Sequence, residues 1–221
     1  MTAMYIALEG PDGVGKSSTA AALRVLLQGR LSTPAYPGTP FVAVRHFPTD
    51  VLTLCAERDD SRLTAEDYLK DMENWLGFRP GPVLYPDVPE RPSLRDATCI
   101  YILDRWVLST SVYAHIRRET IPPRLDPALE WLARIPLVTF VLMPRRDQTP
   151  DLVDPDYPGP APYNPVQTAE AYRRFMEGAL LQGPLDAYVP IAVDRTVDTP
   201  QSTAYTIAEW LEGAPNHSAI G

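Results

Sequence analysis

Hydrophobic and polar positions follow two recurring patterns along this chain. Short runs of consecutive apolar residues are typical of strands buried in a parallel sheet, and they alternate with stretches whose apolar residues recur every three or four positions, as in helices. The runs predict strands at Met4–Leu8, Phe41–His46, Cys99–Leu103, Leu137–Met143 and Tyr188–Val193. The intervening stretches predict helices at Lys16–Gln28, Thr64–Leu76, Trp106–Arg118, Asp126–Arg134, Gln167–Gln182 and Pro200–Glu212.

Local signals set several of these boundaries. Gly29 supplies a stop after the first helix, and Thr64 supplies an N-cap that is followed by an acidic first turn. Pro190 cannot donate a ladder hydrogen bond, so we expect the last strand at an edge of the sheet. Strands that alternate with helices indicate a parallel sheet covered on both faces, with ligands bound at the carboxyl ends of the strands.

The most specific motif follows the first strand. The residues from Gly10 to Ser17, G-P-D-G-V-G-K-S, match the phosphate loop G-x-x-x-x-G-K-[ST], and they lie between a predicted strand and a predicted helix. Such a loop turns backbone N–H groups toward a phosphate chain, while the lysine reaches its β- and γ-phosphates and the serine holds Mg²⁺. The alternative is a glycine-rich turn that matches by chance, and the strand–loop–helix context disfavours it. We therefore expect a nucleoside triphosphate at Gly10, Gly13, Val14, Gly15, Lys16, Ser17 and Ser18.

This motif narrows the fold class to the P-loop NTPase three-layer α/β sandwich, with a five-stranded parallel sheet and helices on both faces. A chain of 221 residues is long enough for one full-sized core. We expect a single domain over residues 1–213 and a flexible tail over residues 214–221.

The chain holds 25 prolines, about twice the usual share, and they concentrate in two segments. Because proline disrupts a helix interior, we expect residues 77–96 and 144–165 to be non-helical loops. Long loops in a compact domain are often functional, so the first is a candidate acceptor wall and the second a candidate lid. We expect residues 151–165 to be mobile without ligand; a merely stiffened surface loop is the open alternative.

Charge and cysteine content exclude some classes of function. A net charge of −8 argues against a nucleic-acid or anionic-membrane partner, because both favour a basic surface. Cys55 and Cys99 show no metal-binding or redox spacing, which favours plain thiols in a reducing compartment. No stretch reaches membrane-spanning length, and we expect a cytoplasmic protein.

Charged residues follow the second and third strands, at the edge where ligands are expected. Asp104 ends a buried apolar run, which is the usual place for a second Mg²⁺-organising carboxylate, although it could instead cap the next helix. Arg45 and Arg105 carry planar guanidinium groups suited to phosphate oxygens. For Arg105 the alternative is an ion pair with a neighbouring carboxylate.

These residues favour a kinase with an anionic acceptor. Phosphoryl transfer depends on alignment and charge neutralisation, and an acceptor phosphate is already ionised, so it requires no general base. A hydroxyl acceptor would require one, for which Asp12 and Asp104 are candidates. Two arginine clamps favour a nucleoside monophosphate kinase, whose catalytic residues we expect to be Asp12, Lys16, Asp104 and Arg105.

Two segments resemble the thymidylate kinase family of nucleoside monophosphate kinases. Tyr5–Ser17 resembles that family's opening, including the aspartate in the loop, and Asp104–Tyr113 resembles its D-R-Y-x-x-S-x-x-A-Y signature, with Trp106 in place of the first tyrosine. The resemblance implies ATP, Mg²⁺, a small nucleotide acceptor and a homodimer. It also implies that Val193–Arg195 lies by the donor adenine. The residues that it implies at the acceptor are Asp12, Arg45, Phe47, Asn74, Arg105, Ser109, Thr110 and Tyr113.

In detail, the resemblance implies that Asp12 contacts the sugar 3′-hydroxyl and that Phe47 stacks near the acceptor. Arg45 and Arg105 would lie by the acceptor phosphate. Tyr113 would pack against the deoxyribose and Thr110 would face the base.

The chain departs from the family at several points. The loop position that often carries a catalytic arginine is Val14, and residues 151–165 contain no arginine, so Arg145 and Arg146 are the nearest substitutes. Asn74 stands where relatives offer an arginine to the thymine carbonyl, and the loop from Gly77 to Asp96 is longer than its counterpart. We expect dTMP as the leading acceptor, with a nucleotide that carries another or a modified base as the alternative.

Two other functions compete with the monophosphate kinase. A phosphate-loop kinase for the hydroxyl of a nucleoside-like or sugar metabolite would explain the missing lid arginine. A GTPase-like switch would need a guanine-binding N-K-x-D motif, which the sequence lacks.

Overall fold

The computed structural model describes residues 3–32, 40–47, 63–77, 94, 97–118, 137–147, 164–177, 188–194 and 196–213. Its strands are β1 (Ala3–Glu9), β2 (Phe41–His46), β3 (Cys99–Asp104), β4 (Leu137–Pro144) and β5 (Tyr188–Val193). They form one parallel sheet in the order β2-β3-β1-β4-β5. This confirms the predicted five-stranded sheet, and β5 lies at its edge, as Pro190 indicated.

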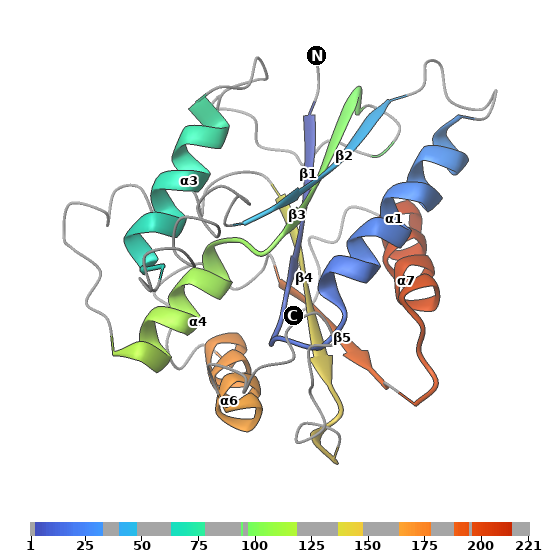
Figure 1. The fold of residues 1–221 in the computed structure, drawn as a ribbon. Helices are drawn as coiled ribbons and strands as arrows, with labels where there is room; N and C mark the ends of the chain where they lie inside the picture. Colours follow the sequence, from blue (N-terminus) through green and yellow to red (C-terminus); the bar gives the residue numbers. More distant parts are fainter. Residues whose placement is uncertain are drawn as a thin grey trace.

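The helices cover the two faces of the sheet (Figure 1). On one side lie α1 (Lys16–Leu31) and α7 (Pro200–Gly213). On the other lie α3 (Ala65–Gly77), α4 (Val107–Arg117) and α6 (Pro165–Met176). The result is the predicted three-layer sandwich of the P-loop NTPase class.

Apolar packing fills the space on both sides of the sheet. Every residue of the central strand β1 is buried, which explains why its sequence is continuously apolar from Ala3 to Leu8 and not alternating. Under α1 and α7 the contacts are mainly aliphatic, with Leu23, Leu27 and Ile207 fully buried. Under α3 they are mainly aromatic, and the rings there belong to Tyr5, Phe47, Trp75, Tyr101 and Trp106.

Two of the described helices differ from their predicted boundaries by more than one residue. The first helix continues past Gly29 to Leu31, so the predicted stop is wrong. In α6, Pro165 occupies the first turn, where its missing N–H is harmless, and Asn164 caps the helix by accepting from the backbone N–H of Val166 at 2.9 Å. The prediction that residue 165 belongs to a non-helical loop is therefore wrong.

The same helix ends earlier than predicted. It closes at Met176, where the cap residue Glu177 donates its backbone N–H to Arg173 and Phe175 carbonyls, and not at Gln182. Gly178 follows in the sequence, a residue type that commonly follows helix ends. The predicted helix at 126–134, loop residues 78–93, lid residues 151–163 and tail 214–221 lie outside the described residues.

Strand register brings the polar strand ends together at one edge. Leu8 of β1 pairs with Asp104 of β3, and His46 of β2 pairs with the same residue from the other side. The phosphate loop leaves β1 at this level and leads into α1. The described helices include none that is long and apolar enough to cross a membrane.

Candidate functional site

The phosphate loop has the backbone shape that its sequence predicted. Gly10, Gly13 and Gly15 all have positive φ angles, of 138°, 76° and 94°. A Cβ on Gly10 would lie 2.2 Å from the Leu142 carbonyl oxygen, so the loop passes too close to β4 for any side chain. Gly15 is the N-cap residue of α1 and has no side chain to accept from the first helical N–H groups. These N–H groups are therefore available to an anion.

Lys16 is buried beside this loop. Its Nζ donates to the Pro11 carbonyl at 2.8 Å and lies 3.8 Å from Asp12 Oδ1. Burial and then the positive charge of Arg105 lower the pKa of Lys16 to about 8, although nearby carboxylates oppose the shift. The negative charge of a bound polyphosphate would stabilise the charged form of this ammonium group.

A cavity of about 290 Å³ opens along the loop toward the start of α7. Its walls combine the phosphate loop with the end of β5 and the first turn of α7, which are the elements between which a nucleotide would extend. The lining residues are Asp12, Gly13, Val14, Gly15, Lys16, Ser17, Ser18, Thr19, Arg105, Val193, Asp198, Thr199, Pro200 and Thr203.

Ser17 and Asp104 meet beside the cavity in an arrangement that fits Mg²⁺. Ser17 Oγ donates to Asp104 Oδ2 at 2.5 Å, and the other carboxylate oxygen of Asp104 is buried with no hydrogen-bond partner among the described residues. Burial opposes ionisation of Asp104, but hydrogen bonds from His46 and Ser17 and the charge of Lys16 hold its pKa below the usual value. An ionised carboxylate beside a hydroxyl is a suitable oxygen pair for Mg²⁺.

Within the described residues no cluster of three or more His, Cys, Asp and Glu side chains could hold a metal. A Mg²⁺ ion at Ser17 and Asp104 would therefore take its other ligands from nucleotide phosphates and water, as Mg²⁺ commonly does. Asp104 does not cap α4, because Trp106 occupies the N-cap position. This excludes the alternative interpretation of Asp104.

His46 also contacts this carboxylate, and the sequence analysis missed it. Its Nδ1 lies 2.7 Å from Asp104 Oδ2. The available signal was its position at the end of a strand, but the contact depends on β2 pairing directly with β3.

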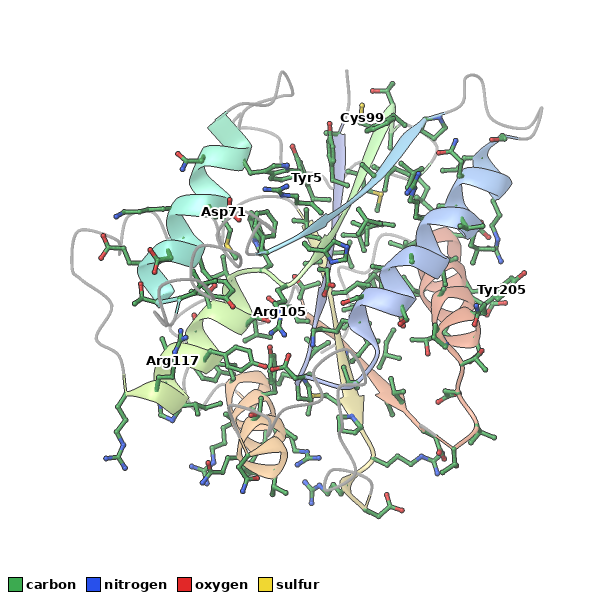
Figure 2. All side chains as sticks on the ribbon, viewed as in Figure 1. Tyr5, Asp71, Cys99, Arg105, Arg117 and Tyr205 are labelled. Atoms are coloured by element: carbon green, nitrogen blue, oxygen red, sulfur yellow. The ribbon has the colours of Figure 1, made fainter. Side chains whose placement is uncertain are left out.

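Asp12, Arg105 and Tyr113 form a second polar group (Figure 2 shows Arg105 between α4 and the sheet). Arg105 donates through Nη2 to Asp12 Oδ1, and Tyr113 donates to Asp12 Oδ2 at 2.8 Å. The guanidinium carbon of Arg105 also lies 5.2 Å from the centre of the Tyr113 ring. The ion pair considered as an alternative for Arg105 is thus present, and the same side chain lines the cavity.

The charges in this group stabilise one another. Burial would raise the pKa of Asp12, but Arg105 and Lys16 outweigh it and hold that pKa well below its usual range. Burial disfavours the charged form of Arg105, and Asp12 more than offsets this, so the pKa of Arg105 is raised. Both groups are therefore ionised.

Two other acceptor candidates, Arg45 and Asn74, lie at β2 and α3. Arg45 Nη2 lies 3.7 Å from Asp71 Oδ1 on α3. The guanidinium carbon of Arg45 lies 5.4 Å from the centre of the Phe47 ring. Both contacts are on the face of the sheet that α3 covers. The Nε of Arg45 is buried without a partner among the described residues. Asn74 is exposed on α3. The sequence analysis did not single out Asp71.

Two hydroxyl groups of α4 form hydrogen bonds to other groups of the protein. Thr110 Oγ1 lies 3.4 Å from the Trp106 carbonyl oxygen, and Ser109 Oγ bonds both Glu9 and Tyr172. Both residues are buried. Glu9 and Tyr172 are further residues that the sequence analysis did not identify.

Arg145 directly follows β4 and contacts the end of β5. Its Nη1 pairs with Asp194 Oδ2 at 2.9 Å, which joins the ends of β4 and β5. Arg145 is not among the cavity-lining residues named above, and Arg195 lies outside the described residues.

Comparisons with known proteins identify this fold. No protein-family model matches the chain, and no curated protein sequence matches it. Two similar solved structures are thymidylate kinases. The one from Ehrlichia chaffeensis is 14% identical with a TM-score of 0.57, over 96% of this chain and 100% of that chain. The one from Candida albicans is 17% identical with a TM-score of 0.56, over 100% of this chain and 96% of that chain. At these identities the likeness establishes a thymidylate kinase fold.

Proposed function

We propose that this protein is a nucleoside monophosphate kinase that transfers the γ-phosphate of ATP to a deoxynucleoside monophosphate. The observation that carries the proposal is the position of Arg105. Its guanidinium group lines the same cavity as Lys16 and the phosphate loop, so one cavity offers cationic groups to two phosphate chains. The fold shared with thymidylate kinases supports the same reaction class.

On this proposal the residues have separate roles in donor binding. The phosphate-loop N–H groups and Lys16 would bind the ATP phosphates, and Ser17 with Asp104 would hold Mg²⁺, which when bound would neutralise part of the phosphate charge. His46 orients the Asp104 carboxylate through its hydrogen bond.

Asp12, Arg105 and Tyr113 would bind the acceptor. Arg105 binds the acceptor phosphate opposite the γ-phosphate, while Asp12 and Tyr113 form the polar wall for the sugar. The Candida albicans enzyme has broad substrate specificity, which supports testing acceptors beyond dTMP. An exposed Asn74 in place of an arginine also supports a base other than thymine.

The ionisation of the carboxylates argues against a hydroxyl acceptor. A general base for a hydroxyl works best with a pKa near the working pH, but Asp12 and Asp104 both have pKa values below their ordinary ones. An acceptor phosphate needs no such base. The pKa directions therefore favour a phosphate over a hydroxyl as the attacking group.

An activity panel tests the proposal. The protein is incubated with ATP, Mg²⁺ and each of the four common deoxynucleoside monophosphates, and the products are identified by chromatography. We expect a deoxynucleoside diphosphate from at least one acceptor. ADP formation from none of them would refute the proposed function.

Variants assign the transfer to this cavity. We expect Arg105→Ala to lower kcat/KM for the acceptor on the order of 100- to 1,000-fold, because it removes a charged donor from the developing phosphoryl charge. Arg24→Ala is the matched control, since Arg24 is an exposed arginine on α1. Activity that survives Arg105→Ala but is lost on Asp12→Asn would instead indicate a hydroxyl acceptor.

A further inference from the structure

Glu9, the last residue of β1, is a buried carboxylate with an unusual set of donors. It has no exposed surface. Its Oε1 accepts from the backbone N–H groups of Trp106 at 2.9 Å and Ser109 at 3.1 Å. Its Oε2 accepts from the Ser109 N–H at 3.2 Å and from the Ser109 hydroxyl. All of these donors belong to one end of α4.

These donors are the ones that a helix start leaves unpaired. Trp106 is the N-cap residue of α4, and it supplies no side-chain cap. An N-cap side chain normally accepts from the second or third helical N–H, and here that role passes to Glu9, which accepts from Ser109, the third helical residue. A carboxylate at this end is also stabilised by the helix dipole. Glu9 therefore caps α4 from a neighbouring strand.

The residue before this cap is Arg105. Its backbone adopts a left-handed φ of 74°, which is unfavourable for a residue with a side chain, and its N–H donates to Leu8 of β1 at 3.0 Å. Two successive residues of β1, Leu8 and Glu9, thus bind two successive backbone N–H groups, those of Arg105 and Trp106. These bonds hold the strained turn that aims the Arg105 side chain at the cavity.

The hydrogen bonds continue from α4 to α6. Ser109 Oγ lies 2.7 Å from the Tyr172 hydroxyl, and Tyr172 is fully buried. With Glu9 ionised, Tyr172 donates to Ser109 and Ser109 donates to Glu9. The Tyr172 hydroxyl, the Ser109 hydroxyl and the Glu9 carboxylate then each have a hydrogen-bond partner, which a buried network requires.

We propose that Glu9 is a positioning residue, which caps α4 from the phosphate-loop strand and so fixes Arg105 and Tyr113 relative to the bound donor phosphates. Glu9 itself is enclosed and does not touch substrate. The kinetic part of this inference rests on the proposed monophosphate kinase function, and the structural part does not.

Two substitutions of Glu9 distinguish the loss of its hydrogen-bond acceptors from the loss of its negative charge. Glu9→Gln keeps a carbonyl oxygen for the Trp106 and Ser109 N–H groups, and its amide N–H₂ can donate to the Ser109 hydroxyl. Glu9→Ala removes every acceptor. Leu211→Ala is the control for stability alone, because Leu211 is a buried core residue near the end of α7, at the opposite end from the turn that lines the cavity.

Hydrogen exchange measures the cap without any substrate. We expect the α4 amides of Glu9→Ala to exchange on the order of 10-fold faster than those of Leu211→Ala at matched global stability, and those of Glu9→Gln to stay near wild type. Equal α4 protection in Glu9→Ala and Leu211→Ala would overturn the inference.

Kinetics measure the positioning. With the best acceptor from the panel, we expect Glu9→Ala to lower acceptor kcat/KM on the order of 10- to 100-fold, because a small misplacement of a catalytic group is costly. The KM for ATP should change less than about threefold, and Glu9→Gln should recover most of the loss. An acceptor kcat/KM equal to that of Leu211→Ala would overturn the inference while leaving the proposed function intact. If no acceptor reacts with the wild type, the proposed function fails, and α4 exchange alone decides the cap.

Discussion

The pKa values of single residues at this site are set by burial and by the charges of neighbouring residues. Burial raises the pKa of Glu9 to about 7, although the Ser109 hydrogen bonds and the charges of Arg105 and Lys16 oppose the shift. In the unfolded chain a glutamate titrates near 4.5. The folded protein therefore binds an extra proton between these two pH values, and this stabilises it most at the acidic end.

This titration gives a stability prediction for Glu9→Gln. Below pH 4.5 the contribution of Glu9 is fully present, and it is lost as the pH rises through 7. Between pH 5 and pH 8 the wild type should lose up to roughly 3 kcal/mol of unfolding free energy relative to Glu9→Gln. Urea denaturation of both proteins across this range measures the difference. Parallel curves would show that Glu9 stays ionised throughout.

Residues with a motif were predictable, and residues that depend on packing were not. Lys16, Ser17, Asp104 and Arg105 were predicted as candidates from fixed spacing or position after a strand, and the structure brings them together. Glu9 precedes the phosphate loop directly in the sequence, but its cap forms with residues about 100 positions away. Contacts of this kind depend on the order of strands, which the apolar pattern does not specify.

Among the elements, the phosphate loop is the most constrained by its neighbours. Gly10 combines a positive φ with close approach to the Leu142 carbonyl on β4. Gly29 lies in α1 with no atom within 4 Å of an added Cβ. An added Cβ would therefore clash with β4 at Gly10 and would meet open space at Gly29.

A pair of alanine substitutions tests this contrast. Gly10→Ala should displace the loop from β4 and lower ATP affinity at least about 10-fold, because the strained backbone and the clash with Leu142 cannot both be relieved. Gly29→Ala should stabilise the protein by roughly 0.5–1 kcal/mol, because alanine loses less backbone entropy in a helix. Calorimetric ATP titration and thermal denaturation check the two effects. Unchanged ATP affinity in Gly10→Ala would contradict the account of the loop.

Element boundaries were predicted less well than the elements themselves. Gly29 was interpreted as a stop, but the helix gains enough packing from Leu27 and Leu31 to continue through it. Pro165 was assigned to a loop, although a proline is well tolerated in a first helical turn. In both cases tertiary packing or capping outweighed the local residue signal.

At the scale of the whole molecule, the sheet order explains why distant segments meet. Placing β3 beside β1 brings Asp104 and Arg105 to the phosphate loop, and placing β2 beside β3 adds His46. The alternating pattern predicted the sheet and its two helical layers. Neither the strand order nor the contact between Arg45 and Asp71 follows from that pattern, because both depend on which elements pack together.

On the proposed function, the cavity would hold the phosphate chains of donor and acceptor end to end. A ligand that joins adenosine to a deoxynucleoside through five phosphates tests it most directly, because such a ligand would occupy both halves at once. We predict that isothermal titration calorimetry will give a Kd on the order of 100-fold or more below that of ATP, with most of the gain lost in Arg105→Ala. Binding no tighter than ATP, or an equal gain in Arg105→Ala, would contradict the account.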